Sequence, residues 1–331
     1  MKRVKVKPYT SADWPLVQRI IQQWQFKPFS QYCAQNSPEL TELWLGRIKN
    51  LFRNPECTAW IARGENGTIG LALLCQLPWD SNQLSFPVAR LDFLISTGDY
   101  LRQCRIHSSL LKAVCDFCNR ESIGYLSARI DASEISALHV LERFGFVTLD
   151  GILTFGMELK NEAAARFAAE VSIRPATPRD NKVVADLARS SYLFDRFHTD
   201  PVILKALADE LFASWARNSC RGKVADSVLV AENGSGVVGF VTCKLQHDSK
   251  NYLGTKIGNI VLVATAKEAQ GQGIARALTQ ASLDWFSREE VGIVEVGTQL
   301  RNIPAVRLYE SSGFRLVKSS LSLRRYWKRR S

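Results

Sequence analysis

Apolar and polar positions in the second half of the chain follow first a strand-like and then a helix-like period. The apolar run at residues 257–263 predicts a buried strand, and the apolar positions of residues 275–286 recur at the spacing of one helix face. A second apolar run, at residues 291–296, predicts a strand after that helix. Upstream, residues 227–243 read as a hairpin that turns at residues 233–236. Strands that alternate with helices indicate an α/β fold.

A short glycine-rich turn joins the first of these strands to the helix. It reads Gln270, Gly271, Gln272, Gly273, Ile274 and Ala275. Glycine lets a ligand approach the backbone closely, and the free N–H groups of a first helical turn favour a phosphate at the positive end of the helix dipole. The spacing therefore predicts a cradle for a pyrophosphate. A turn that carries glycine for backbone geometry alone is the alternative at this point.

This turn and a later pattern together resemble the GNAT superfamily of acyl-CoA-dependent N-acetyltransferases. The superfamily motif Gln/Arg-x-x-Gly-x-Gly/Ala is matched by Gln270, Gly273 and Ala275. A second family pattern is matched near the end of the chain by Asn302, Ala305, Tyr309, Gly313 and Phe314. The resemblance covers residues 171–327 and implies an enzyme that transfers an acetyl group from acetyl-CoA to a primary amine.

The resemblance also implies roles for single residues. Backbone groups around Val263 and Thr265 would hold the pantetheine arm and polarise the thioester carbonyl. Asn302 would lie near the cofactor and cap the helix that carries Tyr309. Tyr309 would be the general acid, since a phenol in a dry site can protonate the leaving thiolate. A core aromatic at helical spacing is the alternative for Tyr309.

The first half of the chain is a degraded repeat of the second half. Residues 137–146 echo residues 305–314, so the offset is 305 minus 137, or 168. At this offset Gln270, Gly273, Ala275, Asn302 and Tyr309 correspond to Arg102, Arg105, His107, Glu134 and Leu141. Side chains in place of glycine block the close approach of a ligand, and leucine has no proton to donate. The alternative is that Arg102 and Arg105 bind phosphate in another way.

The repeat predicts two tandem GNAT-type domains. We expect residues 1–163 to form a degenerate domain without a cofactor cradle and residues 168–331 to form the catalytic acetyltransferase domain. The alanine- and charge-rich residues 160–170 are expected to form a linker helix. A chain of 331 residues that is 46% hydrophobic is long enough for two full cores.

Composition also bears on location and on metals. The chain has no apolar run of membrane-spanning length, and its first residues lack the apolar core of a signal peptide, so we expect a cytoplasmic protein. Its eight cysteines form no spaced framework, which suits a reducing compartment. Cys115 and Cys118 form a C-x-x-C inside a helical pattern, where core packing is the expectation, and no metal site is predicted.

The net charge of +11 has two interpretations. A basic, aromatic tail at residues 324–330 is typical of nucleic-acid surfaces, but a solvated tail is the favoured reading. The positive field would also attract acidic small molecules such as acetyl-CoA and a nucleotide-linked substrate. Oligomeric state is left open, with a homodimer as one option.

The acceptor is suggested by a further resemblance. Residues 191–201, with Arg196 and His198 as candidate substrate ligands, resemble the corresponding region of bacterial TDP-fucosamine acetyltransferases, a branch of the superfamily. This implies a nucleotide-linked 4-amino-4,6-dideoxy sugar as acceptor. A surface pair between Arg196 and Asp200 is the alternative. A peptide or other small amine as acceptor, or an acyl-CoA sensor without turnover, also stays open. The general base is unassigned among Glu295, His198 and Asp200.

Overall fold

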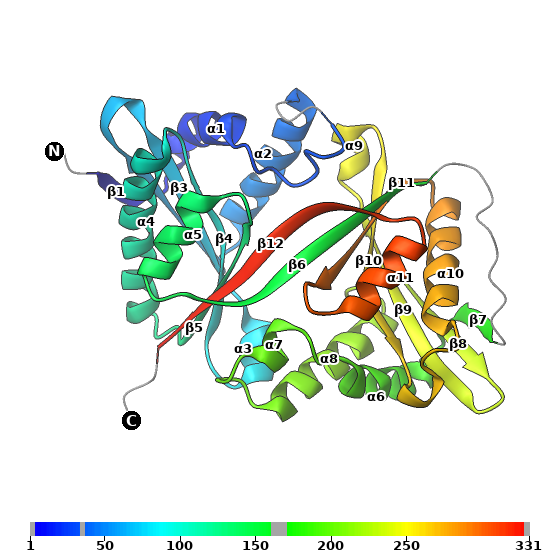
Figure 1. Cartoon of the computed structure of the whole chain (residues 1–331). Coiled ribbons are helices and arrows are strands. Elements are labelled where there is room, and N and C mark those ends of the chain that lie inside the picture. Colours follow the sequence, from blue (N-terminus) through cyan, green and yellow to red (C-terminus); the bar gives the residue numbers. More distant parts are fainter. Residues whose placement is uncertain (1–3, 34–36, 160–170, 328–331) are drawn as a thin grey trace. The chain divides into compact units, whose positions relative to one another are not determined.

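The structure is a computed structural model that describes residues 4–33, 37–159 and 171–327. Its contacts divide the chain into two compact units. Unit 1 comprises Met1–Asp150 together with Ser319–Ser331, and unit 2 comprises Gly151–Lys318. Each unit contains one mixed sheet with helices packed on it (Figure 1). The mixed α/β architecture predicted from the sequence is confirmed.

The sheet of unit 1 has the strand order β1-β2-β3-β4-β5-β12. Its strands are β1 (Lys5–Pro8), β2 (Cys57–Arg63), β3 (Ile69–Gln76), β4 (Val88–Ser96), β5 (Tyr125–Asp131) and the second part of β12 (Arg315–Tyr326). All neighbours are antiparallel except β4 and β5, which are parallel.

Two hydrophobic cores lie against the two faces of this sheet. The helices of unit 1 are α1 (Trp14–Gln23), α2 (Pro38–Arg53), α3 (Pro78–Leu84), α4 (Tyr100–Arg120) and α5 (Ile135–Arg143). On β2 the side chains alternate, so that Ile61 packs with α1 and α2 while Trp60 packs with α4. Unit 1 is therefore a three-layer α/β/α structure.

Unit 2 repeats this plan with the strand order β6-β11-β10-β9-β8-β7. Its strands are β6 (Val147–Glu158), β7 (Ser172–Pro175), β8 (Ser227–Asn233), β9 (Gly236–Gln246), β10 (Lys256–Thr265) and β11 (Val291–Gln299). Its helices are α6 (Asn181–Ser191), α7 (Arg196–Thr199), α8 (Lys205–Cys220), α9 (Ser249–Leu253), α10 (Ile274–Arg288) and α11 (Ile303–Ser311). The predicted hairpin, strands and amphipathic helix of this half are all present.

The internal repeat is visible in the element bounds. Subtracting 168 from α11 (303–311) gives α5 (135–143), and subtracting it from β12 (315–326) gives β6 (147–158). In both halves of the repeat the first strand, β1 or β7, is followed by a capping box, made by Thr10 with Asp13 and by Thr177 with Asp180. The two halves therefore have the same local structure at the same relative positions.

The compact units differ from continuous segments of the chain, because each sheet contains a strand from the other half. From residue 152 onward β6 pairs antiparallel with β11 of unit 2, and from residue 320 onward β12 pairs antiparallel with β5 of unit 1. The sequence boundary expected at residues 160–170, with its linker helix, lies outside the described residues. The sequence repeat alone does not reveal the exchange of these strands.

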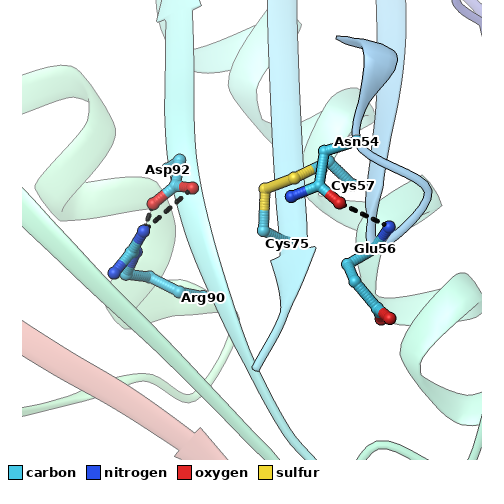
Figure 2. Close-up of a disulfide and its surroundings, with 6 residues drawn as sticks. All are labelled: Asn54, Glu56, Cys57, Cys75, Arg90 and Asp92. Atoms are coloured by element: carbon cyan, nitrogen blue, oxygen red, sulfur yellow. Dashed lines mark hydrogen bonds and ion pairs between the residues drawn. A yellow bond between two sulfur atoms is a disulfide. The ribbon is translucent and has the colours of Figure 1, made fainter. Parts of the chain in front are cut away.

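A disulfide joins Cys57 on β2 to Cys75 on β3 (Figure 2). The two residues lie directly opposite each other in the antiparallel register. This corrects the expectation that the cysteines form no framework, because cross-strand pairing depends on register and not on a recognisable spacing. Cys115 and Cys118 are buried as expected, and Cys115 Sγ lies 3.1 Å from Arg325 Nη1.

Candidate active site

The candidate site in unit 2 begins where two parallel strands separate. β10 and β11 are paired from Lys256 to Ile260, yet β10 continues to Thr265 and β11 to Gln299. A register shift in the pairing of β10 with β9 falls at the same point, between Ile260 and Leu262. The edge of β10 that faced β11 is therefore unpaired over its last residues.

The orientation of the backbone on this edge follows from the pairing with β9. Ala266 N donates to Val238 O at 2.8 Å, and antiparallel partners alternate between bonded and non-bonded pairs. The N–H and C=O of Val263 and Thr265 therefore point to the open edge. Thr265 Oγ1 is buried and has no hydrogen-bond partner among the residues that the structure describes. The edge thus offers polar groups that a ligand can satisfy.

The glycine turn leads from this edge into α10. Gly271 and Gly273 have φ of 78° and 77°, a left-handed conformation that glycine adopts without strain, and a Cβ on either would meet no atom within 4 Å. Gly273 is the N-cap of α10 and carries no capping side chain. The first hydrogen bond of α10 is donated by Ala277 N to Gly273 O at 3.0 Å. The amides before it have no intrahelical acceptor.

The other cradle residues support this geometry. Gln270 is extended, and Gln272 Nε2 donates to Glu268 O, which closes a turn that contains Gly271. Ile274 is buried and fixes the start of α10 in the core, while Ala275 has a small side chain in the first turn. An open, uncapped helix N-terminus with two left-handed glycines fits the pyrophosphate of acetyl-CoA.

Tyr309 lies on α11 and its ring is buried, with 4% of the residue exposed. It packs against Phe155 and Phe314 at centroid distances of 6.0 Å and 5.9 Å. Burial raises the pKa of the Tyr309 phenol, so the group keeps its proton at neutral pH. Asn302 is the N-cap of this helix, and its Oδ1 accepts from Ala305 N at 3.3 Å, as expected for its capping role.

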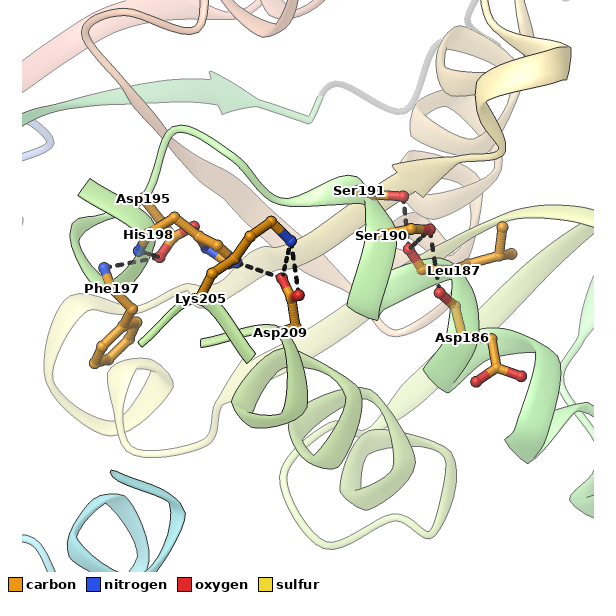
Figure 3. A network of polar contacts seen from close by, with 9 residues as sticks. All are labelled: Asp186, Leu187, Ser190, Ser191, Asp195, Phe197, His198, Lys205 and Asp209. Carbon is orange, nitrogen blue, oxygen red and sulfur yellow. Dashed lines mark hydrogen bonds and ion pairs between the residues drawn. The ribbon is translucent and has the colours of Figure 1, made fainter. Parts of the chain in front are cut away.

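His198, a candidate substrate ligand, lies in a network of charged side chains (Figure 3). Its Nδ1 is hydrogen-bonded to Asp195 and its Nε2 lies 2.9 Å from Asp209 Oδ1, which also pairs with Lys205. These carboxylates raise the pKa of His198 against the opposing effect of burial. With both ring nitrogens engaged, His198 has no free nitrogen for a substrate or for proton abstraction while the network is intact.

The other candidates near the acceptor segment are placed as follows. The Arg196 guanidinium lies over the Phe197 ring, with its Cζ 4.6 Å from the centroid. Asp200 is buried and its Oδ1 accepts from Val202 N at 3.1 Å, which stabilises the chain after α7. Glu295 is buried on β11, one residue before the last pair with β10. Of the three candidate bases, Glu295 is therefore the one on a strand beside the point where β10 and β11 separate.

Two residues near the site were missed by the sequence analysis. Tyr192, at the end of α6, donates through its hydroxyl to Val263 O at 3.2 Å. Arg301 Nη2 donates to Thr199 Oγ1 at 2.7 Å and so joins the loop after β11 to α7. Tyr192 lies in the segment 191–201 that the resemblance singled out, and Arg301 directly precedes Asn302, but no pattern distinguished either residue from its neighbours.

The corresponding region of unit 1 has a different structure. The pairing of β4 with β5 also stops early, at Leu91, while β4 continues to Ser96. Here, however, α4 begins at Tyr100 and the Asp99 carboxylate caps it by accepting from Arg102 N. The counterparts of the cradle residues therefore lie inside α4, and the Asp99 carboxylate already occupies the N-terminus of this helix. Leu141 is a buried core residue.

Side chains also close the space beside β4. His107 Nε2 lies 2.9 Å from Ser96 Oγ, and Gln103, the counterpart of Gly271, donates to Ser96 O at 3.5 Å. Ser136 Oγ in turn donates to Gln103 Oε1 at 2.8 Å. Among the described residues no group of His, Cys, Asp and Glu could hold a metal ion in either unit, and no helix is both long and apolar enough to cross a membrane.

Comparison with known proteins connects this geometry to a family. The family model described as "Acetyltransferase (GNAT) family" matches residues 187–314, and the model "Acetyltransferase (GNAT) domain" matches residues 3–147. A solved tandem GNAT protein from the clavulanic acid biosynthesis pathway has a TM-score of 0.61 at 14% identity, over 98% of each chain. This likeness concerns the fold.

Curated relatives are similar over long stretches. The spore coat polysaccharide biosynthesis protein SpsD of Bacillus subtilis is 26% identical over 73% of this chain and 78% of its own length. The dTDP-fucosamine acetyltransferase of Escherichia coli O6:H1 is 24% identical over 61% of this chain and 80% of its own length. A mycothiol acetyltransferase of Saccharomonospora viridis is 28% identical over 56% and 60%, respectively. With two family matches in tandem that together span more than half of its length, the chain belongs to the GNAT acetyltransferases.

Proposed function

We propose that this acetyl-CoA-dependent N-acetyltransferase has one active site, in unit 2, and acetylates the primary amine of a nucleotide-linked 4-amino-4,6-dideoxy sugar. The observation that carries the proposal is the combination of an open edge on β10 with an uncapped glycine cradle at the start of α10. The described part of unit 1 has no open cradle, and its sequence has Leu141 in place of the Tyr309 phenol. We therefore assign it a structural role.

Each part of the site has a defined task in this proposal. The amides of residues 271–276 bind the pyrophosphate, and the open edge at Val263 and Thr265 binds the pantetheine arm and polarises the acetyl carbonyl. The neutral amine attacks that carbonyl, the carbon–sulfur bond breaks, and Tyr309 donates its proton to the thiolate. The proton lost by the amine passes to a base, for which Glu295 is our candidate, and water returns a proton to Tyr309.

The acceptor class rests on similarity together with charge. SpsD and dTDP-fucosamine acetyltransferase are both named for sugar metabolism, and each matches over more than three quarters of its own length. Arg196 is the proposed ligand for a nucleotide phosphate, since guanidinium groups match phosphate oxygens. His198 would position α7 beneath this ligand through its two carboxylate contacts. A cytoplasmic location, where acetyl-CoA is available, is part of the proposal.

The test is thiol release from acetyl-CoA with a panel of amines. The panel contains TDP-4-amino-4,6-dideoxyhexoses, a polyamine, a peptide with a free N-terminus and a cysteinyl amino sugar of the mycothiol type. We expect turnover with the nucleotide sugars alone, and a fall in kcat of about 100-fold or more in Tyr309→Phe. The matched control Tyr252→Phe, on α9, should behave like the wild type.

The outcomes separate the parts of the proposal. Turnover with another member of the panel would contradict the acceptor assignment and leave the donor site intact. Binding of acetyl-CoA without turnover of any amine would favour a sensor. Full activity of Tyr309→Phe would remove Tyr309 as the acid.

A further inference from the structure

Tyr192 belongs to residues 191–201, the acceptor segment, and it contacts β10, the donor strand that carries the proposed acetyl-CoA edge. It follows the last residue of α6, and its hydroxyl donates to Val263 O at 3.2 Å. Its ring stacks on Phe212 of α8, with the centroids 4.3 Å apart and the planes 14° apart. Phe212 also stacks on Trp215 and on the clamped imidazole of His198. The Tyr192 phenol is thus held by a packed aromatic group.

The carbonyl that Tyr192 contacts has lost its usual partner. The pairing of β10 with β11 ends at Ile260, and the backbone groups of Val263 point to the edge that β11 has left. Burial of a carbonyl without a hydrogen-bond partner costs free energy, and the peptide groups of a strand are less fixed in orientation where no neighbouring strand pairs with them. The Tyr192 hydroxyl supplies the missing donor at this position.

The hydrogen bond from Tyr192 restrains both backbone groups of Val263. In an extended strand the N–H and the C=O of the same residue point to the same edge. A fixed Val263 carbonyl therefore also fixes the Val263 N–H, which belongs to the edge assigned to the pantetheine arm and the acetyl carbonyl. Unit 1 closes its corresponding space in another way, since Gln103 donates to Ser96 O from within α4.

We propose that Tyr192 is a positioning residue for acetyl transfer: by taking the place of β11 on the open edge, it aims the Val263 amide at the thioester carbonyl. This inference rests on the proposed function for the donor site but not on the identity of the acceptor. It also connects the acceptor segment to the donor strand, because the Tyr192 ring is held by α8.

The electrostatic surroundings keep Tyr192 in its donating form. Burial raises the pKa of its phenol well above the ordinary value, and the negative charges that Tyr309 and Asp195 can carry raise it further. The hydrogen bond to Val263 acts in the opposite direction. The hydroxyl therefore keeps its proton over the pH range of acetyl transfer, so its hydrogen bond to the strand persists.

The experiment compares wild type, Tyr192→Phe and the control Tyr252→Phe with [1-¹³C]acetyl-CoA bound and no acceptor present. Phenylalanine keeps the stack on Phe212 and removes only the hydroxyl. The ¹³C shift and the infrared stretching frequency of the thioester carbonyl report its polarisation, and calorimetry gives the affinity. We expect the wild type and Tyr252→Phe to show a polarised carbonyl. In Tyr192→Phe the carbonyl signal should move back toward that of free acetyl-CoA, with a Kd within about threefold of wild type.

Turnover provides the second measurement once an acceptor from the panel is in hand. Misplacement of the edge should lower kcat of Tyr192→Phe by roughly 10-fold to 100-fold, with little change in KM for acetyl-CoA and an unchanged melting temperature. An unchanged carbonyl signal in Tyr192→Phe, or a loss of affinity that accompanies a lower melting temperature, would overturn the inference. Failure of the wild type to bind acetyl-CoA would instead contradict the donor site itself.

Discussion

Units 1 and 2 have the same strand divergence but differ at the start of the helix that follows it. In both units two parallel strands pair for only a few residues and then separate. In unit 2 the chain then passes through two left-handed glycines before α10 begins, whereas in unit 1 α4 begins at once behind the Asp99 cap. The divergence is thus a property of the fold, and the helix start determines whether it can serve a phosphate ligand.

The largest expected effect comes from giving unit 2 the helix start of unit 1. Gly273→Asp places a carboxylate at the N-cap of α10, as Asp99 does for α4, in a left-handed conformation that disfavours any side chain. The carboxylate occupies the free amides and repels the pyrophosphate, so calorimetry should show acetyl-CoA binding weakened by about 100-fold or more. Asp99→Ser, which keeps a cap in unit 1, should bind like the wild type. Equal loss in both variants would break the comparison.

The second prediction follows from the pairing of β12 with β5 in the sheet of unit 1. Leu323 and Leu316 lie on the same strand, β12, but Leu323 is buried in the core of unit 1 and Leu316 is 55% exposed. Leu323→Ala should lower the free energy of unfolding by about 2–4 kcal/mol and increase hydrogen exchange in β5, while Leu316→Ala should change stability by less than about 0.5 kcal/mol. If Leu323→Ala instead increased exchange in α10 and spared β5, the assignment of this strand to unit 1 would be wrong.

The disulfide should stabilise unit 1 alone. A crosslink between residues 18 positions apart restricts the unfolded chain and contributes about 3 kcal/mol. Thiol titration of the denatured, unreduced protein should detect six free cysteines of eight, and reduction should increase hydrogen exchange in β2 and β3 without effect on β8 and β9. Eight free thiols without reductant would mean that the bond does not form.

His107 in unit 1 and His198 in unit 2 should respond to pH in opposite directions. Burial lowers the pKa of His107 in unit 1 from 6.5 to about 4. As the pH falls from 6.5 to 4, the unfolded chain takes up a proton that folded unit 1 does not, so unit 1 loses up to about 3 kcal/mol. The raised pKa of His198 has the reverse consequence, because its contribution is complete below pH 6.5 and is lost as the pH rises through the folded value.

Hydrogen exchange measured at several pH values separates these effects. Protection of α4 should decrease toward acid, and protection of α7 and the start of α8 should decrease toward alkaline pH. His107→Gln should remove the acid sensitivity of α4 and leave α7 unchanged. A common pH dependence of both regions would contradict the separate origins.

Much of the site could be predicted from the sequence because glycine has a local signature. Two glycines in close succession between a strand and a helix, such as Gly271 and Gly273, indicate a turn. The spacing from this turn to Asn302 and Tyr309 then points to a family. The degraded character of unit 1 was equally visible, since an offset of 168 places Arg105 and Leu141 where glycine and tyrosine are needed. The structure explains that loss further, through the extension of α4 and its Asp99 cap.

The remaining features depend on contacts between distant segments. β6 and β12 follow equivalent helices at the same offset, so their sequences do not indicate which sheet each will join. The Cys57–Cys75 bond depends on the register of β2 and β3. Tyr192 reads as an ordinary aromatic at a helix end until its hydroxyl is found on the Val263 carbonyl. Composition and periodicity carry no information about such pairs.

The most direct test of the central claim is the stoichiometry of acetyl-CoA binding to the whole chain, measured by calorimetry against the active protein concentration. We predict one molecule of acetyl-CoA per chain, because within the described residues only unit 2 has an open cradle. Two molecules per chain would contradict it, since unit 1 would then bind the donor despite its capped helix and closed strand edge.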